Sequence, residues 1–141
     1  VEMVGTIRTL SEQTRRNIPV LLETMARNIA KAHGGDIEFI YEPMYPVLIN
    51  DKTMVDVAKK AFAKIVGESN VKELEEPNMG GEDFAYIARE VPSAFLFVGI
   101  AKDESIPVLH HHPIFQWDYK ELLSLGRGFA QIAIDYLSET V

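Results

Sequence analysis

Hydrophobic and polar positions follow two different periods at the start of the chain. Val1, Met3 and Ile7 alternate with polar residues over residues 1–10, which predicts a half-buried strand. Residues 11–33 then repeat their apolar positions with the helical period, at Ile18, Leu21, Leu22, Met25 and Ile29. This stripe predicts an amphipathic helix.

The ends of this first helix carry their own signals. Thr9 and Glu12 have the spacing of a capping box, and Gly34-Gly35 is a typical stop. Pro19 lacks a backbone donor, so it predicts either a kink or a helix that starts near Asn17 with the proline in its first turn.

A second strand is expected after the helix. Residues 36–41, DIEFIY, place Ile37, Phe39 and Tyr41 on one face. Two strands and one helix cannot close a hydrophobic core alone. We therefore expect a missing part of the protein, or a partner chain, to complete this sheet.

Pro43 and Pro46 interrupt the pattern and predict a boundary between two parts of the chain. After it, Asn50 or Asp51 is expected to cap a helix that ends near Gly67. The apolar stripe of this helix is Met54, Ala58, Ala61, Phe62 and Ile65.

The second part predicts three further elements. A helix should open at Glu82, and the continuous apolar run at 94–100 predicts a strand covered on both faces. A last helix over residues 120–138 should bury one stripe, made of Leu122, Leu125, Phe129, Ile132, Ala133 and Tyr136. Together the elements predict the α/β class, as the edge of a larger layered structure.

Composition narrows the possible partners. The net charge is −7, which excludes counterion-release binding to nucleic acid or to an anionic membrane. The chain has no cysteine, so disulfides, thiolate nucleophiles and Cys-ligated zinc are excluded.

There is no membrane-length apolar run and no signal pattern, so we expect a cytoplasmic protein. The first residue is Val1, and we expect a processed or trimmed chain, or part of a longer one.

The sequence MGGEDF at residues 79–84 is the first candidate for chemistry. Gly80 and Gly81 allow a backbone to approach a ligand closely, and they precede a predicted helix N-terminus. Glu82 and Asp83 also suit a first helical turn for electrostatic reasons, so a purely structural role stays open. The spacing does not fit a nucleotide-binding loop.

The second candidate is the histidine cluster His110, His111 and His112, followed by Pro113. Adjacent side chains of an extended loop point to alternate sides, so at most one is expected to bind a given ion. The competing interpretation is a polar surface loop, or a histidine ring packed on Phe115 or Trp117. A zinc site without cysteine needs three or four His and carboxylate ligands, and the only other histidine is His33. If His111 binds metal, most of the site must lie elsewhere.

Three stretches of the chain carry a family resemblance: GTIRT at 5–9, NMGGEDFAYIAREVPSAFLFVGI at 78–100, and LHHHP with a following aromatic at 109–115. In this order they resemble the C-terminal portion of the M20 family of dinuclear-zinc peptidases and amidohydrolases. The most similar branch contains aminoacylases, hippurate hydrolases, auxin-conjugate hydrolases and thermophilic carboxypeptidases.

The resemblance implies an architecture and a set of roles. Residues 1–46 resemble part of a lid or dimerisation βαβ unit, and residues 47–141 resemble the C-terminal α/β part of the catalytic domain. His111 corresponds to a metal ligand, whereas His112 occupies a variable position. Gly80 and Gly81 correspond to a turn that approaches substrate and metal, and Tyr45 is expected to line the substrate pocket. A homodimer through the lid is also implied.

The resemblance places the other metal ligands and the general-base glutamate upstream, so this chain contains no catalytic residue of its own. A complete enzyme would use a dinuclear zinc site, or other divalent metals, to activate water against the amide of an N-acyl amino acid or small peptide. This chain alone is expected to be inactive. A non-catalytic dimerising module, and a different α/β enzyme that binds an anion at Gly80-Gly81, are the alternatives.

Overall fold

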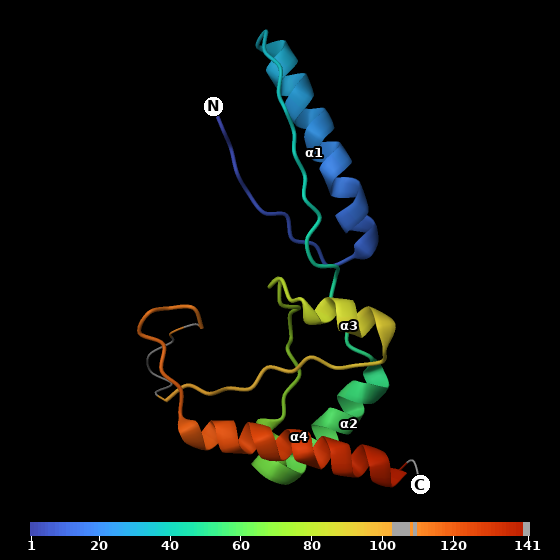
Figure 1. Cartoon of the computed structure of the whole chain (residues 1–141), viewed down its shortest axis with the longest axis vertical. Helices are drawn as coiled ribbons and strands as arrows, with labels where there is room; N and C mark the ends of the chain where they lie inside the picture. The colour runs from blue at the N-terminus through green and yellow to red at the C-terminus, as the bar shows by residue number, and fades with distance from the viewer. Residues whose placement is uncertain (103–107, 109, 140–141) are drawn as a thin grey trace. The chain divides into compact units, whose positions relative to one another are not determined.

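The structure is a computed structural model that describes residues 1–102, 108 and 110–139. These residues form four α-helices and one 3-10 turn (Figure 1). The elements are α1 (Glu12–Ala32), α2 (Lys52–Val66), η1 (Glu68–Asn70), α3 (Phe84–Glu90) and α4 (Tyr119–Glu139).

The chain divides into two compact units. Unit 1 comprises Val1–Ile49 and Leu74–Val91, and unit 2 comprises Asn50–Glu73 and Pro92–Val141. Residues 74–91 therefore pack with the N-terminal part, although the expected boundary at residues 46/47 groups them with the C-terminal part. The boundary at residues 46/47 stays a prediction about where the lid portion ends and the catalytic portion begins. The two units describe only which residues pack together.

Helix α1 of unit 1 begins earlier than the proline suggested. The side chain of Ser11, not Thr9, caps the helix, accepting a hydrogen bond from the Thr14 N–H at 3.1 Å. Pro19 lies inside one helix from Glu12 to Ala32, so the expected start near Asn17 is wrong. The serine cap satisfies one of the free N–H groups of the first turn, which stabilises the turns before the proline.

The C-terminal end of α1 confirms the glycine stop. Gly34 has a φ of 75°, and its N–H donates to the Lys31 carbonyl at 3.0 Å. The Gly35 N–H donates to the Ala30 carbonyl at 2.9 Å. This pair of bonds is a Schellman motif, in which glycine accepts the left-handed conformation at little cost.

The residues after this stop run back alongside α1 (Figure 1). Arg27 donates from Nη1 to the Ile37 carbonyl at 2.9 Å. Arg15 donates to the Met44 carbonyl at 2.7 Å and to the Tyr45 carbonyl at 3.1 Å. The returning backbone is therefore held by arginine side chains of the helix instead of by a neighbouring strand.

The predicted strands are not formed in the described part of the chain. There the only β pairing is an isolated antiparallel bridge between Ala101 and Trp117, and segments 1–10, 36–41 and 94–100 have no strand partner. The structure is helical, so the α/β class is not confirmed. The physical reason is that a strand is stable only when its N–H and C=O groups have neighbouring strands to pair with.

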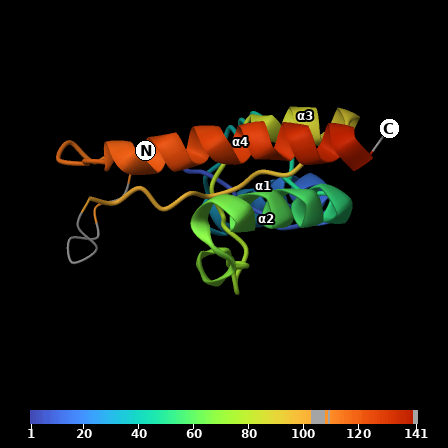
Figure 2. The ribbon, with the colours of Figure 1, turned by 90° about the horizontal axis from the view of Figure 1, so that it is seen from below.

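Helix α2 of unit 2 has the predicted ends. Asp51 caps it by accepting from the Met54 N–H at 3.0 Å, and Gly67 ends it with a φ of 85°. Its buried residues are Ala58, Ala61 and Phe62, which all belong to the predicted stripe. Helix α2 packs against α4 along this face (Figure 2).

The face of helix α4 that meets α2 overlaps the predicted stripe only in part, because Leu125 and Ile132 are half-buried but other members of the stripe are exposed. Gly128 is buried against the ring of Phe62, whereas Phe129 of the predicted stripe is 59% exposed. The Phe129 and Phe62 rings still meet edge to face, with centroids 6.3 Å apart. A glycine lets the two helices approach closely, so the Phe62 ring packs on Gly128 as well as against the Phe129 ring.

Candidate functional site

The glycine turn of unit 1 is shaped by an asparagine side chain. The Gly80 N–H donates to Oδ1 of Asn78 at 2.6 Å. A Cβ atom at Gly80 would lie 2.7 Å from the same oxygen, a distance that real Cβ contacts do not show. The turn therefore requires glycine at this position while the Asn78 bond is present.

Gly81 brings two of the predicted substrate-binding positions together. A Cβ atom at Gly81 would lie 3.2 Å from Cδ2 of Tyr45 and 3.5 Å from Nη1 of Arg8. The Tyr45 ring is 40% exposed and meets the Tyr86 ring edge to face at 6.2 Å between centroids. Gly81, Tyr45 and Arg8 therefore form one cluster, which we call the glycine-turn cluster.

The helix after this turn starts two residues later than predicted. Helix α3 begins at Phe84, and Glu82 lies before it with its carboxylate accepting from the Phe84 N–H at 3.3 Å. The side chain of Glu82 is therefore engaged by the backbone that follows the turn. Since α3 has only seven residues, its N-terminus contributes little to an anion site by itself.

The histidine loop lies in unit 2, and all three of its imidazoles are exposed. His111 has a φ of 72°, the left-handed region that non-glycine residues rarely adopt. Its ring meets the His110 ring edge to face, with centroids 4.8 Å apart. Nδ1 of His112 accepts from the Ile114 N–H at 3.3 Å, so the third imidazole is engaged by the backbone of its own turn.

His111 is chemically suited to hold a metal, because it is an exposed imidazole. In the part of the chain that the structure describes, no group of three or more His, Asp or Glu side chains is arranged to hold a metal ion. A metal ion at His111 would therefore need further ligands that the described residues do not bring to it. The loop residues 103–107 and 109 lie outside the described residues.

Sequence reasoning missed Arg8 and Asn78. Both lie within the stretches that carry the family resemblance, but neither has a periodic or spacing signal of its own. Arg8 reaches the turn across 71 residues of sequence, through a bond from Nη1 to the Met79 carbonyl at 3.0 Å. Only a structure reveals a contact of that separation.

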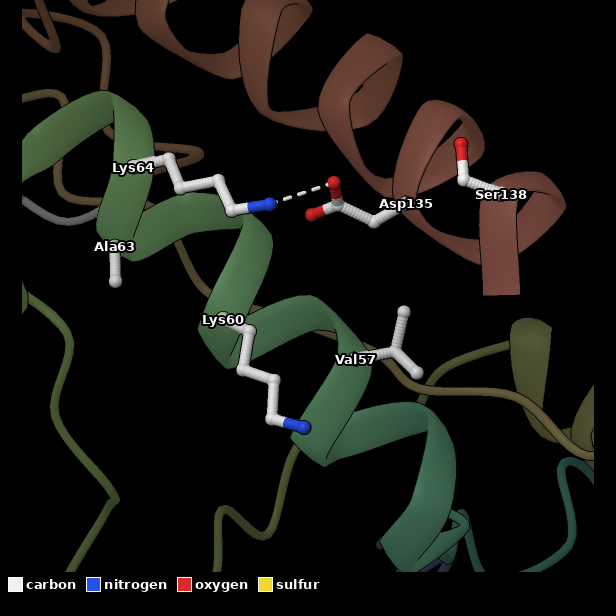
Figure 3. A pocket seen from close by; sticks show the side chains of 6 residues that line it. All are labelled: Val57, Lys60, Ala63, Lys64, Asp135 and Ser138. Carbon is white, nitrogen blue, oxygen red and sulfur yellow. Dashed lines mark hydrogen bonds and ion pairs between the residues drawn. The ribbon is translucent and has the colours of Figure 1, made fainter.

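A pocket also lies between α2 and α4 in unit 2, and none of the predicted site residues lines it (Figure 3). Its lining residues are Val57, Lys60, Ala63, Lys64, Asp135 and Ser138. Nζ of Lys64 donates to Oδ1 of Asp135 at 2.7 Å, and Nε2 of Gln131 donates to the same oxygen at 2.8 Å. We interpret the pocket as a polar helix-to-helix contact.

This contact predicts a pH-dependent stability. The Lys64 ammonium, and then the Gln131 amide, lower the pKa of Asp135 from its ordinary value of 3.8. The folded state therefore binds this proton less readily than the unfolded state, and the stability is present above the ordinary pKa and lost as pH falls through the lowered one. We expect Asp135→Asn to reduce the melting temperature at neutral pH and to flatten its acid dependence.

The matched control is Glu90→Gln, because Glu90 has no ion pair among the described residues. Thermal unfolding followed by circular dichroism from neutral pH down to about pH 2 makes the comparison. If the melting temperature of Asp135→Asn falls with acid as steeply as that of the unsubstituted protein, the Lys64–Asp135 ion pair does not contribute to the acid dependence of stability.

The chain matches the profile of peptidase family M20/M25/M40 over residues 4–132. It is 34% identical over 140 residues to N-acetylcysteine deacetylase of Bacillus subtilis, covering 99% of this chain and 35% of that protein. It is 30% identical over 145 residues to IAA-amino acid hydrolase ILR1-like 4 of Arabidopsis thaliana, covering 99% of this chain and 32% of that protein.

A third relative is thermostable carboxypeptidase 2 of Saccharolobus solfataricus, which is 28% identical over 137 residues, 96% of this chain and 34% of that protein. The chain thus spans about a third of the length of the relatives it matches. No solved structure matches it significantly. Among the described residues, no helix is both long and apolar enough to cross a membrane.

Proposed function

Because this chain belongs to peptidase family M20/M25/M40, we propose that it is the C-terminal portion of a metal-dependent hydrolase of amide bonds. The observation that carries the proposal is the family match over residues 4–132. The names of its relatives support N-acyl amino acids or small peptides as the substrate class. A cytoplasmic location stays a prediction.

The proposed metal centre is shared between this chain and an upstream segment. The family resemblance assigns one ligand to His111. Its imidazole is exposed, and its neighbour His112 is engaged by the loop backbone. Zinc held there would supply Lewis acidity toward the amide carbonyl. Two zinc ions are expected, and other divalent metals stay open. The remaining ligands and the general base are proposed to lie upstream, so the chain alone is inactive.

The residues of the glycine turn are proposed to bind substrate. The two glycines form the turn, and the partly exposed Tyr45 ring lies beside Gly81, where it provides an apolar wall. The acyl group of the substrate would pack on this ring. These assignments are supported by the proximity of Gly81 and Tyr45 within unit 1.

A homodimer through residues 1–46 is the third element of the proposal. Three apolar residues of the predicted α1 stripe, Leu21, Met25 and Ile29, are each more than half exposed. Such a stripe is stabilised when another surface covers it. The alternative function, a non-catalytic dimerising module, rests on the same stripe and predicts a dimer that hydrolyses nothing.

The test compares this chain with an extended polypeptide, defined as the same chain preceded by the residues that are encoded upstream of it. We expect elemental analysis after zinc dialysis to find close to no metal in the chain and about two ions per subunit in the extended polypeptide. Only the extended polypeptide should hydrolyse N-acyl amino acids, and chelation should stop it.

Two outcomes would contradict the proposal. Stoichiometric metal in the short chain would mean that its own residues, or two copies of it, assemble a site. A metal-free or inactive extended polypeptide that sediments as a dimer would favour the non-catalytic module.

A further inference from the structure

The guanidinium of Arg15 in α1 is held by three groups of unit 1. Its Nη2 donates to the Met44 carbonyl at 2.7 Å, and its Nε donates to the Tyr45 carbonyl at 3.1 Å. Its Nη1 forms an ion pair with Oε1 of Glu12 at 3.2 Å. The side chain is only 20% exposed, so this arginine holds backbone of its own unit instead of facing solvent.

The ion pair with Glu12 does not by itself account for the burial of Arg15. Arg16 pairs with the same carboxylate at 3.5 Å, and its side chain is 70% exposed. A solvent-exposed ion pair contributes little to stability. The bonds from Arg15 to the carbonyls of Met44 and Tyr45 are therefore the contacts that give this arginine a specific role.

The segment that carries Tyr45 depends on these bonds for its position. Among the described residues, 36–49 form neither a helix nor a strand and have no strand partner, so no ladder of backbone bonds fixes them. The Tyr86 hydroxyl also donates to the Met44 carbonyl, at 3.3 Å. Arg15 makes the shorter bond to that carbonyl and also holds the next one along the chain.

The position of this backbone determines where the Tyr45 ring lies. Cδ2 of the ring is 3.2 Å from the position of a Cβ atom at Gly81, and the ring meets the Tyr86 ring edge to face. A tyrosine ring moves relative to its own backbone only by rotation about two side-chain bonds. If the Tyr45 carbonyl is released, the ring is no longer held beside the glycine.

We propose that Arg15 is a positioning residue, which holds the Tyr45 ring in the glycine-turn cluster and thereby raises the affinity for the apolar acyl part of the substrate. This inference rests on the proposed function, and it adds a residue that no sequence motif singles out. A ring that is fixed before the ligand arrives loses less conformational entropy on binding. Loss of Arg15 should therefore weaken binding of large acyl groups and leave the chemistry at the amide unchanged.

The first test needs neither metal nor turnover. In the 141-residue chain, NMR should show a nuclear Overhauser cross-peak between the Tyr45 ring protons and the Gly81 α protons. Arg15→Gln should lose this cross-peak. Arg15→Lys should weaken it, because an ammonium lacks the planar fork that spans both carbonyls. Circular dichroism checks that the helices of each variant are retained.

Arg27→Gln is the matched control for this test. Arg27 also lies in α1 and donates to a carbonyl of the same returning segment, that of Ile37, at 2.9 Å. It lies in the part of the segment away from Tyr45, so its loss should leave the Tyr45–Gly81 cross-peak in place.

The second test measures hydrolysis by the extended polypeptide. N-phenylacetyl-L-alanine and N-acetyl-L-alanine differ only in a phenyl ring. We expect Arg15→Gln to raise KM for the phenylacetyl substrate about tenfold relative to the acetyl substrate, with kcat unchanged for both. In a Tyr45→Ala background the same substitution should have no such effect, because the ring through which Arg15 acts is gone.

A retained Tyr45–Gly81 cross-peak in a folded Arg15→Gln chain would overturn the inference. So would additive effects of Arg15→Gln and Tyr45→Ala on KM, or equal losses for both substrates, as a purely structural role of Arg15 predicts. If Arg15→Gln unfolds α1, Arg15→Lys carries the same comparisons. An extended polypeptide that hydrolyses neither substrate contradicts the proposed function instead, and the cross-peak still decides whether Arg15 positions Tyr45.

Discussion

His111→Ala in the extended polypeptide is expected to lower hydrolysis of N-acyl amino acids by well over about a hundredfold. Loss of an outer partner of a metal ligand already costs about 10- to 100-fold in affinity or activity, and loss of the ligand itself should cost more. Elemental analysis should show less than the full metal content in the same protein. The two measurements together connect the histidine to the metal and the metal to the activity.

The left-handed backbone conformation of His111 makes a second variant necessary. Its φ of 72° is strained for alanine as well as for histidine, so His111→Ala removes the imidazole and leaves the strain. His111→Gly removes the imidazole and relaxes the backbone. Both variants should lose metal and activity to the same extent, whereas the glycine variant should be the more stable of the two.

His110→Ala and His112→Ala serve as controls within the same loop. The His110 ring meets the His111 ring edge to face, and His112 is engaged by the Ile114 N–H. We expect smaller losses from both than from His111→Ala. Full metal content and activity in both His111 variants would remove this residue from the proposed site.

Local signals explain why the helices were predictable. Helix α2 begins after Asp51 and ends at Gly67, as the sequence indicated, and α1 ends at Gly34-Gly35. These ends were predictable because a cap depends on residues only a few positions away. The start of α1 shows the limit of the same reasoning. Ser11 and Thr9 can both cap a helix, and Pro19 predicted either a kink or a later start. In the structure, tertiary bonds from Arg15 hold the first turns in place.

The strands were not predictable in the same way, because pairing is not local. The apolar run at 94–100 has the composition of a buried strand, yet its backbone is held at Phe95 by the amide side chain of Asn50, at 2.7 Å and 3.0 Å. Among the described residues, extended segments that have no neighbouring strand are what a portion of a larger sheet would leave. The chain matches its family and spans about a third of the length of a relative such as N-acetylcysteine deacetylase of Bacillus subtilis, which fits that interpretation.

The candidate site also has parts that local sequence signals indicated and parts that only the fold brings together. Residue types indicated the glycine turn and the histidine loop, and the resemblance supplied Tyr45. That Tyr45 touches Gly81, 36 positions later, follows from the fold and not from any pattern in the sequence. Arg8 shows the converse case, since a single cation in a predicted strand gives no indication of the turn that it reaches.

The packing of α2 on α4 gives the second large prediction. A Cβ atom at Gly128 would lie 2.4 Å from Cε1 and Cζ of Phe62, a side chain that is only 8% exposed. The ring cannot move aside without disturbing the small core around Ala58 and Ala61. Overpacking of this kind costs about 1–3 kcal/mol, which exceeds the roughly 1 kcal/mol by which alanine favours a helix over glycine. Gly128→Ala should therefore reduce the free energy of unfolding.

Gly126→Ala is the matched control, because it makes the same substitution in the same helix. A Cβ atom at Gly126 would meet nothing within 4 Å, so only the helix preference acts there. We expect Gly126→Ala to stabilise the protein by up to about 1 kcal/mol, and Gly128→Ala to destabilise it, in urea unfolding. Phe62→Leu should reduce the penalty at Gly128 and leave the effect at Gly126 unchanged, since it replaces the ring that the new methyl group meets by a smaller aliphatic side chain. Equal effects of the two alanines would show that α4 does not contact α2 through Gly128.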